Sequence, residues 1–449
     1  MRVDQFVFRN LIYRPVTWIR GQNVFGYLGR LDKTQWLPAD KIAAIQLERL
    51  QALLPTVRRD SPAYGRRLAD SPRTIASLDD LHRIPTLSKQ DLRSEKAELQ
   101  STNLPALCVS KTTGGSTGEP VTLLKTRYAM AWELAATWRG YSWAGIDIGD
   151  SQARFWGVAI DSKSRAKAQL IDFVCHRKRF SAFGFSRDSF PEYERRLKEF
   201  SPDWFYGYVS MVAEFARWYI ESGRESPVQP RAVVTTSEVL SPDDRAAIAT
   251  AFRTRVFNEY GCGELGTIAH ECAEGRLHTS DENMIVEILD GERPCKPGEK
   301  GEMVITELNN TAMPLIRYRT GDFAAFAEEP CPCGRQLKVI DKLYGRAYDF
   351  ILSPSGRKFH AEFLMYIFEE AQRHEIGIAQ FQVRQTKIDT LEVLAVPSPG
   401  GFTPEAERSL VNRIRSLLGE DMTVNVTRVQ RIERERSGKM RVIVGLPQA

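Results

Sequence analysis

Between residues 151 and 270, short apolar runs alternate with amphipathic stretches of helical periodicity. The apolar runs are ARFWGVAI, DWFYGYVS, RAVVTTSEVL and RVFNEYG, and the stretches between them are PEYERRLKEF, MVAEFARWYIES and DDRAAIATAF. Parallel strands need crossover connections, which are usually helices, so this alternation is typical of a parallel sheet. The pattern therefore predicts an α/β fold for the centre of the chain.

The pattern changes after residue 277 and again near residue 345. Residues 277–343 contain short strand-like runs separated by turns, which predict a β-rich subdomain. After a break at Gly345 and Arg346, helices fit 361–374 and 404–418 and strands lie between them. We therefore expect an α/β protein with a large N-terminal domain, residues 1–344, that combines parallel α/β sheets with the β-rich subdomain. A small, mobile α+β C-terminal domain would occupy residues 345–449.

Composition limits the class of protein. The chain has 449 residues, of which 42% are hydrophobic and 27% charged, so disorder is excluded as its main state. Residues 1–60 contain ten Lys/Arg and five Asp/Glu, and this excess of five positive charges equals the net charge of the whole chain, +5. There is no run of about 18 apolar residues and no signal-peptide pattern, so we expect a cytoplasmic protein.

The basic N-terminal segment, residues 1–36, is also rich in aromatic side chains. One interpretation is a segment packed on the main body of the protein. The other is a basic and aromatic surface that associates peripherally with a membrane or with a partner. The sequence leaves both interpretations open.

The first chemical motif is the loop TTGGSTGEP at residues 112–120. Its three glycines permit tight bends that present backbone N–H groups, and its hydroxyls add donors, so the loop fits a phosphate. It is not a Walker A loop, because no Gly-Lys-Ser/Thr follows.

Four more motifs follow in order. They are NEYGCGE at 258–264, RYRTGD at 317–322, GRAYD at 345–349 and SGKMRV at 437–442. An aromatic ring beside a carboxylate suits a base and a phosphate-bound Mg²⁺, and an aspartate at a strand end suits ribose hydroxyls. Each motif alone is weak evidence for a nucleotide site, and the order and spacing of all five make the combined pattern specific.

Together the five motifs resemble the adenylate-forming superfamily of acyl-CoA synthetases, adenylation domains and luciferases. Within it, the chain is most similar to the phenylacetate–CoA ligase-like branch, which includes capsule-biosynthesis proteins of the CapK type. The resemblance extends from about Ile84 to Val442.

The resemblance implies a role for each matching position. Lys439 would stabilise charge at the α-phosphate, Glu264 would bind Mg²⁺, and Arg346 would hold the nucleotide beside the hinge. The residues implied to contact ATP are Thr113, Gly114, Gly115, Ser116, Thr117 and Gly118 at the phosphates, Ser237 and Glu238 at the adenine edge, Tyr260 and Gly261 beside the adenine, and Asp322 at the ribose. Tyr206, Gly207 and Tyr208 would approach the acyl pocket, although an aromatic core strand explains them equally well.

The activity that the resemblance implies has two steps. A carboxylate attacks Mg·ATP to give an acyl-adenylate and pyrophosphate, and the acyl group then passes to a thiol such as CoA. The alternatives are transfer to an amine or hydroxyl of a sugar or polysaccharide precursor, and a degenerate nucleotide-binding protein without catalysis. Gly263 and Tyr348 depart from the family pattern and favour the last alternative. The retained residues oppose it; they are Glu264, Asp322, Arg346 and Lys439.

Cysteine spacing raises a separate question. Cys272 and His278 lie six positions apart, and Cys331 and Cys333 form a Cys-x-Cys turn. Three thiolates and one imidazole match a closed tetrahedral site, so we expect a structural Zn²⁺, against the alternative of four unrelated side chains. A zinc-knuckle nucleic-acid binder is disfavoured because the surrounding sequence is rich in acidic residues, so we expect no nucleic-acid partner.

Overall fold

The computed structural model describes most of the chain. The described residues are 2–105, 107–112, 122–156, 162–181, 185, 187–238, 240, 242–345, 351–359, 363–364, 367–368, 377–398, 401–430, 432 and 443–446. Three predicted parts of the site lie outside them: the loop residues Thr113–Gly118, the hinge residue Arg346 and Lys439.

One twelve-stranded sheet organises residues 152–345. Its order is β11-β10-β12-β13-β14-β9-β8-β7-β6-β5-β3-β4. The parallel strands are β3 (Gln152–Trp156), β4 (Arg177–Ser181), β5 (Trp204–Tyr208), β6 (Ala232–Thr236) and β7 (Arg255–Cys262). The antiparallel strands are β8 (Gly266–Glu271), β9 (Leu277–Thr279), β10 (Met284–Asp290), β11 (Arg293–Pro294), β12 (Gly301–Glu307), β13 (Tyr318–Phe326) and β14 (Val339–Gly345). The predicted parallel sheet and β-rich part are thus two halves of one sheet that meet at β7 and β8.

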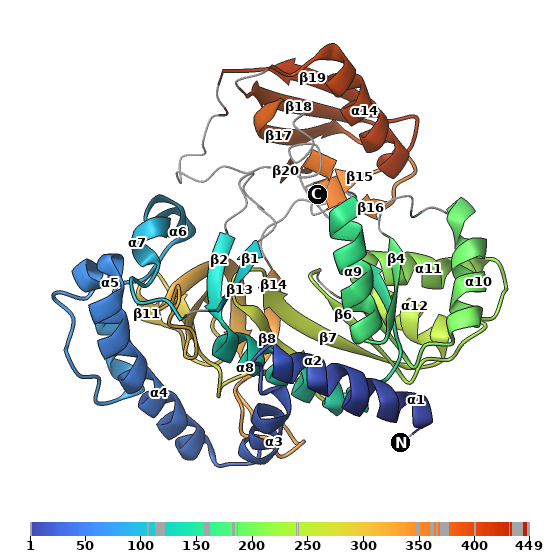
Figure 1. The fold of residues 1–449 in the computed structure, drawn as a ribbon. Coiled ribbons are helices and arrows are strands. Elements are labelled where there is room, and N and C mark those ends of the chain that lie inside the picture. Colours follow the sequence, from blue (N-terminus) through green and yellow to red (C-terminus); the bar gives the residue numbers. More distant parts are fainter. Residues whose placement is uncertain are drawn as a thin grey trace.

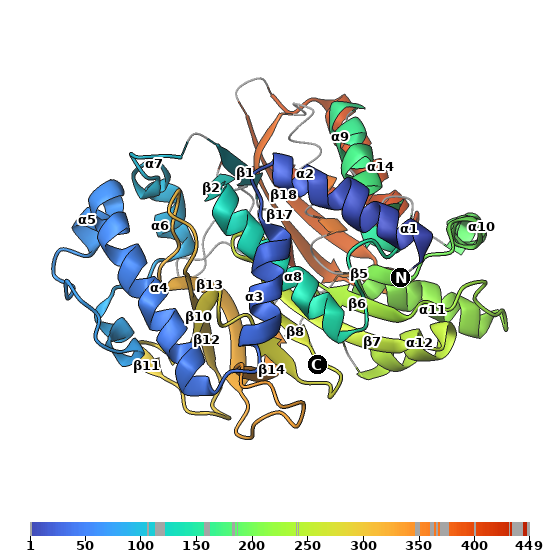
Figure 2. The ribbon, with the colours of Figure 1, turned by 60° about the horizontal axis from the view of Figure 1, so that its bottom comes forward.

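Helices cover both faces of the parallel half (Figure 2). Every residue of β5 and β6 is buried, as expected for parallel strands packed on two sides. Helix α8 (Arg127–Trp143) packs on one face through Tyr141. The helices on the other face are α10 (Phe190–Phe200), α11 (Val209–Glu221) and α12 (Pro242–Phe252). Helix α9 (Ser162–Val174) connects β3 to β4, and the short turn η3 (Arg187–Ser189) precedes α10.

The N-terminal quarter is helical. It contains α1 (Val3–Phe6), the π-helical η1 (Val7–Tyr13), α2 (Arg14–Ile19), α3 (Val24–Thr34), α4 (Ala39–Asp60), α5 (Pro62–Arg67), η2 (Leu78–Arg83), α6 (Lys89–Ser94) and α7 (Lys96–Leu99). Ser88 caps α6, because its hydroxyl accepts a hydrogen bond of 3.1 Å from the Asp91 N–H. The hairpin of β1 (Cys108–Thr112) and β2 (Thr122–Thr126) leads into α8. Among the described helices, none combines the length and the apolar character needed to cross a bilayer.

A second, separate sheet lies at the C-terminal end, above the large sheet in Figure 1. Its order is β19-β18-β17-β20, formed by β17 (Ile378–Lys387), β18 (Thr390–Pro397), β19 (Thr423–Arg428) and β20 (Ile443–Val444). Helix α14 (Pro404–Leu418) packs on it, and the two-stranded sheet of β15 (Ile351–Leu352) and β16 (Lys358–Phe359) precedes it. The large α/β part and the smaller C-terminal sheet agree with the predicted fold class.

Candidate functional site

Tyr260 and Asp322 meet where the two halves of the large sheet join. The Tyr260 hydroxyl donates a hydrogen bond of 2.7 Å to Oδ2 of Asp322, and both residues are buried. Thr320 fixes the aspartate from its own strand, because its hydroxyl accepts the Asp322 N–H at 3.1 Å. Two motifs that are far apart in the sequence therefore share one position in space.

Glu264 lies in the turn between β7 and β8, four residues after Tyr260. Its Oε1 atom accepts a hydrogen bond of 3.3 Å from the Tyr318 hydroxyl and lies 3.1 Å from Nζ of Lys89. The Glu264 side chain is only 4% exposed, so the ammonium group compensates a charge that water scarcely reaches. The sequence analysis missed Lys89, because no local pattern links the first turn of α6 to a residue 175 positions away.

A carboxylate in this position suits a divalent cation. Mg²⁺ prefers oxygen ligands and usually binds through one or two carboxylates together with substrate phosphates. Glu264 supplies such an oxygen from the turn that precedes β8. The residues present therefore fit a phosphate-bound Mg²⁺.

Gly261 is required by the hairpin that presents these groups. A Cβ atom on Gly261 would lie 2.5 Å from the carbonyl oxygen of Gly266, too close for any side chain. The ladder between β7 and β8 shifts register at this point, immediately after Tyr260. This close approach of two backbones explains the glycine of the NEYGCGE motif.

Ser237 and Glu238 follow the end of β6. Ser237 has a φ of 68°, a left-handed conformation that is uncommon for residues other than glycine. The Glu238 carboxylate accepts hydrogen bonds from the Ser210 backbone N–H at 2.6 Å and from the Ser210 hydroxyl at 2.9 Å. Glu238 thus binds the N-terminus of α11, where a negative charge is favoured.

The segment Tyr206–Tyr208 is buried in β5. Tyr206 donates a hydrogen bond of 2.8 Å to Oε1 of Glu259, and Tyr208 stacks on Trp156 with ring centroids 4.1 Å apart. Burial raises the pKa of Glu259, although hydrogen bonds such as the one from Tyr206 act against that shift. Glu259 was missed by sequence reasoning, since it sits within the motif that contains Tyr260 but points into a different network.

The four predicted metal ligands come together. One ligand atom from each of Cys272, His278, Cys331 and Cys333 lies within 4.8 Å of all the others. Sγ of Cys272 is 3.7 Å from Sγ of Cys331, and Sγ of Cys333 is 3.3 Å from Nε2 of His278. The other ring nitrogen of His278 lies 3.2 Å from the Leu337 carbonyl oxygen, the kind of contact that orients a metal-binding imidazole.

The chemistry of this donor set fits Zn²⁺. Burial lowers the pKa of His278 to about 4, so its imidazole is neutral at pH 7, the form that binds a metal. Burial opposes ionisation of Cys333, but hydrogen bonds from Arg335 outweigh it and lower the pKa of that thiol. Three sulfur ligands and one nitrogen ligand are typical of structural zinc sites.

The strands beside the predicted phosphate loop are held by buried charges. Lys125 on β2 is 1% exposed, and its Nζ lies 2.8 Å from Glu133 and 2.9 Å from Glu307. Lys111 on β1 contacts Glu133 at 2.7 Å. Burial opposes ionisation of Glu133, but the two ammonium groups outweigh it and hold its pKa to about 2. Both strands are thereby fixed to α8, and no sequence motif indicated these four residues.

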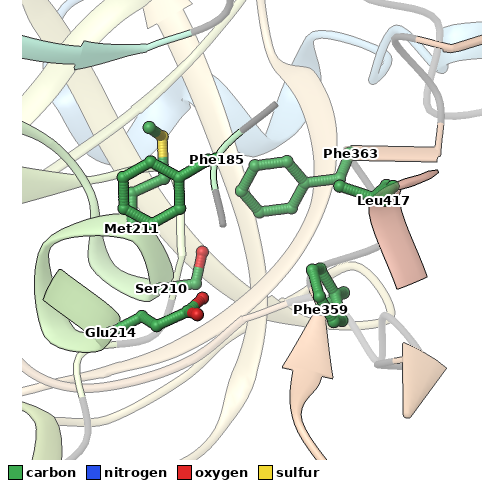
Figure 3. Close-up of a pocket in the computed structure, with 7 residues that line it drawn as sticks. All are labelled: Phe185, Ser210, Met211, Glu214, Phe359, Phe363 and Leu417. Atoms are coloured by element: carbon green, nitrogen blue, oxygen red, sulfur yellow. The ribbon is translucent and has the colours of Figure 1, made fainter. Parts of the chain in front are cut away.

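A cleft separates α11 from the C-terminal sheet. Figure 3 shows Ser210, Met211 and Glu214 on one side, opposite Phe359 and Phe363. Leu417 and Phe185 complete its lining. Across the same boundary, Nη2 of Arg357 lies 2.5 Å from the Glu214 carboxylate, and the rings of Phe363 and Tyr208 are 5.7 Å apart. The C-terminal part therefore contacts the segment that carries Tyr206–Tyr208.

Comparison with known proteins agrees with this geometry. Residues 351–445 match the sequence-family model described as the CapK C-terminal domain. Solved structures of 2-hydroxyisobutyryl-CoA ligase share the fold. The ligase with 2-HIB-AMP and CoA in the thioesterification state gives a TM-score of 0.61 at 18% identity, covering 92% of each chain. The same ligase in the postadenylation state gives a TM-score of 0.60 at 19% identity, covering 92% of this chain and 91% of that one. The fold is thus that of the adenylate-forming acyl-CoA ligases.

Within that class, the similar curated proteins are phenylacetate–coenzyme A ligases and CapK, as the motifs predict. The Thermus thermophilus phenylacetate–coenzyme A ligase is 25% identical over 70% of this chain and 73% of its own length. The Escherichia coli ligase is 24% identical over 92% of this chain and 97% of its own. Protein CapK of Staphylococcus aureus is 23% identical over 89% of this chain and 88% of its own. The resemblance drawn from the five motifs is confirmed.

Proposed function

We propose that this protein is an AMP-forming ligase that activates a carboxylic acid with ATP and transfers the acyl group to a thiol such as CoA. The observation that carries the proposal is that the NEYGCGE and RYRTGD motifs meet through two hydrogen bonds, from Tyr260 to Asp322 and from Tyr318 to Glu264. An aromatic ring, a ribose-binding carboxylate and a metal-binding carboxylate are what a bound Mg·ATP requires. The similarity to phenylacetate–coenzyme A ligases supports the same reaction.

Each group has a task in the first step. Asp322 accepts the ribose hydroxyls, Tyr260 lies against the base, and the loop Thr113–Gly118 surrounds the phosphates. Glu264 would hold Mg²⁺, which would supply positive charge beside the phosphates. Lys439 stabilises the charge that develops on the α-phosphate as the carboxylate attacks and pyrophosphate leaves. Most of the acceleration then comes from positioning and charge, as in other phosphoryl chemistry.

The second step needs a different arrangement around the same adenylate. The C-terminal domain, residues 345–449, turns about Arg346 and withdraws Lys439, so that an acceptor thiol reaches the acyl carbon. The Arg357–Glu214 ion pair and the Phe363–Tyr208 contact link that domain to the large one and must break or change during the turn.

Substrate-dependent exchange between ATP and pyrophosphate tests the proposal, using a panel of aryl, aliphatic and amino-acid carboxylates. Exchange with any acid supports adenylate formation, and consumption of CoA thiol with the same acid supports the second step. Lys439→Ala should abolish exchange while nucleotide binding persists. Lys387→Ala, at an exposed lysine on β17, is the matched control. A chain that binds ATP but gives exchange with no acid would instead favour the non-catalytic alternative.

The match of residues 351–445 to the CapK C-terminal domain favours a second candidate acceptor. Because the resemblance includes capsule-biosynthesis proteins, an amine or hydroxyl of a sugar or polysaccharide precursor is that candidate. Acyl transfer to such a sugar, with no thioester formed when CoA is supplied, would support it over the thiol.

The cluster of Cys272, His278, Cys331 and Cys333 completes the proposed cofactors as a structural Zn²⁺ site. Cys331 and Cys333 lie between β13 and β14, whereas Cys272 directly follows β8 and His278 lies in β9. The site therefore ties the segment before β14 to β8 and β9, the strands that follow Glu264. Bound Zn²⁺ would cross-link these segments and supplies no chemistry to the reaction.

Residues 1–36 supply a surface for peripheral association with a membrane. Along the helix from α1 to α2, Tyr13 and Thr17 are buried, whereas Val3, Leu11 and Trp18 are 82%, 63% and 78% exposed. The outward face of this helix is therefore apolar. Its basic residues and tryptophan are the composition of helices that lie in the interface of anionic bilayers.

Sedimentation with vesicles tests the membrane surface. Binding to phosphatidylcholine vesicles that contain phosphatidylglycerol should exceed binding to phosphatidylcholine alone. It should fall when Leu11 and Trp18 are both changed to Ser. Ile388→Ser, at an exposed isoleucine near the C-terminal sheet, is the control. Equal sedimentation of all three proteins would contradict the assignment.

A further inference from the structure

The rings beside the proposed acyl pocket form a continuous stack. Trp156 on β3 stacks on Tyr208 at 4.1 Å and on Tyr206 at 5.7 Å, with interplanar angles of 25° and 26°. The two tyrosines are buried and the tryptophan is partly exposed. The stack therefore presents an aromatic surface that a ligand can reach at Trp156.

Arg154 lies against the same rings. Its guanidinium carbon is 4.7 Å from the ring centroid of Trp156 and 4.7 Å from that of Tyr206, and it pairs in register with Tyr206 across β3 and β5. Its Nε atom is buried and has no hydrogen-bond partner. Within the described part of the chain Arg154 forms no ion pair, which is uncommon for an arginine beside a buried surface.

Among the described residues, the side chains near Arg154 include further arginines. Arg179 is its register neighbour on β4, and Arg177 lies two residues before Arg179 on the same strand. Both arginines form ion pairs with Asp172, at 2.9 Å from Arg179 and 2.5 Å from Arg177. On the other side, Glu259 is occupied by hydrogen bonds from Tyr206 and Thr236 and forms no ion pair with Arg154.

We propose that the acid activated by this protein carries a second anionic group, and that Arg154 binds it. The carbon skeleton of the acid would lie on the Tyr206–Trp156–Tyr208 stack, with its reacting carboxylate toward the nucleotide. The planar guanidinium fork matches a carboxylate, so the substrate class is a dicarboxylic acid rather than a neutral aryl or fatty acid. This inference rests on the proposed adenylation.

Paired substrates test the charge requirement. ATP–pyrophosphate exchange is measured with succinate, glutarate and benzene-1,4-dicarboxylate, each beside its monomethyl ester. The wild-type protein should favour the diacid of at least one pair by about tenfold or more, the effect of one charged hydrogen-bonding partner. Arg154→Gln should abolish that preference, and Arg154→Lys should restore part of it. Arg187→Gln, which removes an exposed partner of Glu221, should keep it.

Calorimetric binding of the diacids without ATP gives a second readout. Diacid binding that is lost in Arg154→Gln and kept in Arg187→Gln supports the inference, even if no acid gives exchange. The absence of exchange would then count against adenylation but not against the diacid site. Equal rates for each diacid and its ester, or an unchanged preference in Arg154→Gln, would overturn the inference and leave adenylation standing. The inference would also be overturned if no diacid binds while acids without a second anionic group give exchange.

Discussion

The hydroxyl of Tyr260 donates a hydrogen bond of 2.7 Å to Asp322, across 62 positions of sequence. The bond orients the carboxylate that is proposed to accept the ribose hydroxyls, and it keeps the aromatic ring beside it. A nucleotide that binds here meets both groups already in place, which reduces the entropy lost on binding.

Asp322→Asn should weaken nucleotide binding with little effect on folding. The amide oxygen still accepts the Tyr260 hydrogen bond, but the negative charge that strengthens bonds from ribose hydroxyls is gone. We expect a loss of about tenfold in AMP affinity by calorimetry, with a melting temperature close to wild type. Unchanged AMP affinity would contradict the ribose assignment.

Lys89→Met should make stability depend on divalent cations. It leaves the buried Glu264 carboxylate with the Tyr318 hydroxyl but without its ammonium partner, at a cost of about 1–3 kcal/mol. Mg²⁺ should recover more stability in this variant than in the wild type, because the freed carboxylate is a cation ligand. Urea unfolding with and without Mg²⁺ measures both effects. If Mg²⁺ stabilises the two proteins equally, Glu264 is not its ligand.

Cys333→Ser should reduce the metal content and the thermal stability together. A hydroxyl is a poor replacement for a thiolate, and the remaining ligands, Cys272, His278 and Cys331, leave the site open. Elemental analysis should find about one zinc per chain in the wild type and in Cys295→Ser, whose cysteine lies outside the cluster, and clearly less in Cys333→Ser. Equal zinc content in all three proteins would remove the assignment.

Glu259→Gln should change how stability varies with pH. Burial raises the pKa of Glu259 above its unfolded value of about 4.3, so its stabilising contribution is complete below that value and is lost as pH rises through the folded pKa. Glutamine stays neutral and still accepts the Tyr206 hydrogen bond. The variant should therefore gain stability relative to wild type as pH increases above about 4.3, measured by urea unfolding across that range. Parallel profiles would show that Glu259 has an ordinary pKa.

Gly207→Ala should destabilise the parallel half of the sheet. A Cβ there would lie 2.6 Å from both the carbonyl oxygen and the Cβ of Phe155 on the adjacent strand, and neither atom moves freely. We expect a loss of about 1–3 kcal/mol, seen as a lower melting temperature. A melting temperature equal to wild type would show that β3 and β5 can separate locally.

The sequence predicts those features that depend on local spacing. The alternation of strands and helices predicts a parallel sheet, which β3 to β7 form, and the cysteine spacing predicts the grouping of Cys272, His278, Cys331 and Cys333. The sequence does not reveal how the antiparallel half is ordered, because the pairing of β14 with β9, at Val339 and His278, joins segments about 60 positions apart. Such pairing depends on tertiary packing, which leaves no periodic signal.

The functional residues missed by the sequence share the same cause. Lys89, Glu259 and Arg154 are ordinary within their own elements, and each gains its meaning from a partner on another strand or helix. Motifs can be recognised in the sequence where several residues of a pattern are consecutive, as in NEYGCGE. Such recognition fails where one side chain supports a site from a distance.

Adjacent residues of β7 belong to different hydrogen-bond networks. Glu259 joins the Tyr206 network beside the proposed acyl pocket, and Tyr260 joins Asp322 at the proposed nucleotide site. One peptide unit is thus common to both sites, and a shift of the strand that improves one set of contacts alters the other. If the acid binds more tightly when ATP is present, the nucleotide must gain affinity from the acid by the same factor. Each reactant would then bind more tightly once the other is present, so ATP would be held most firmly when an acid is available to react with it.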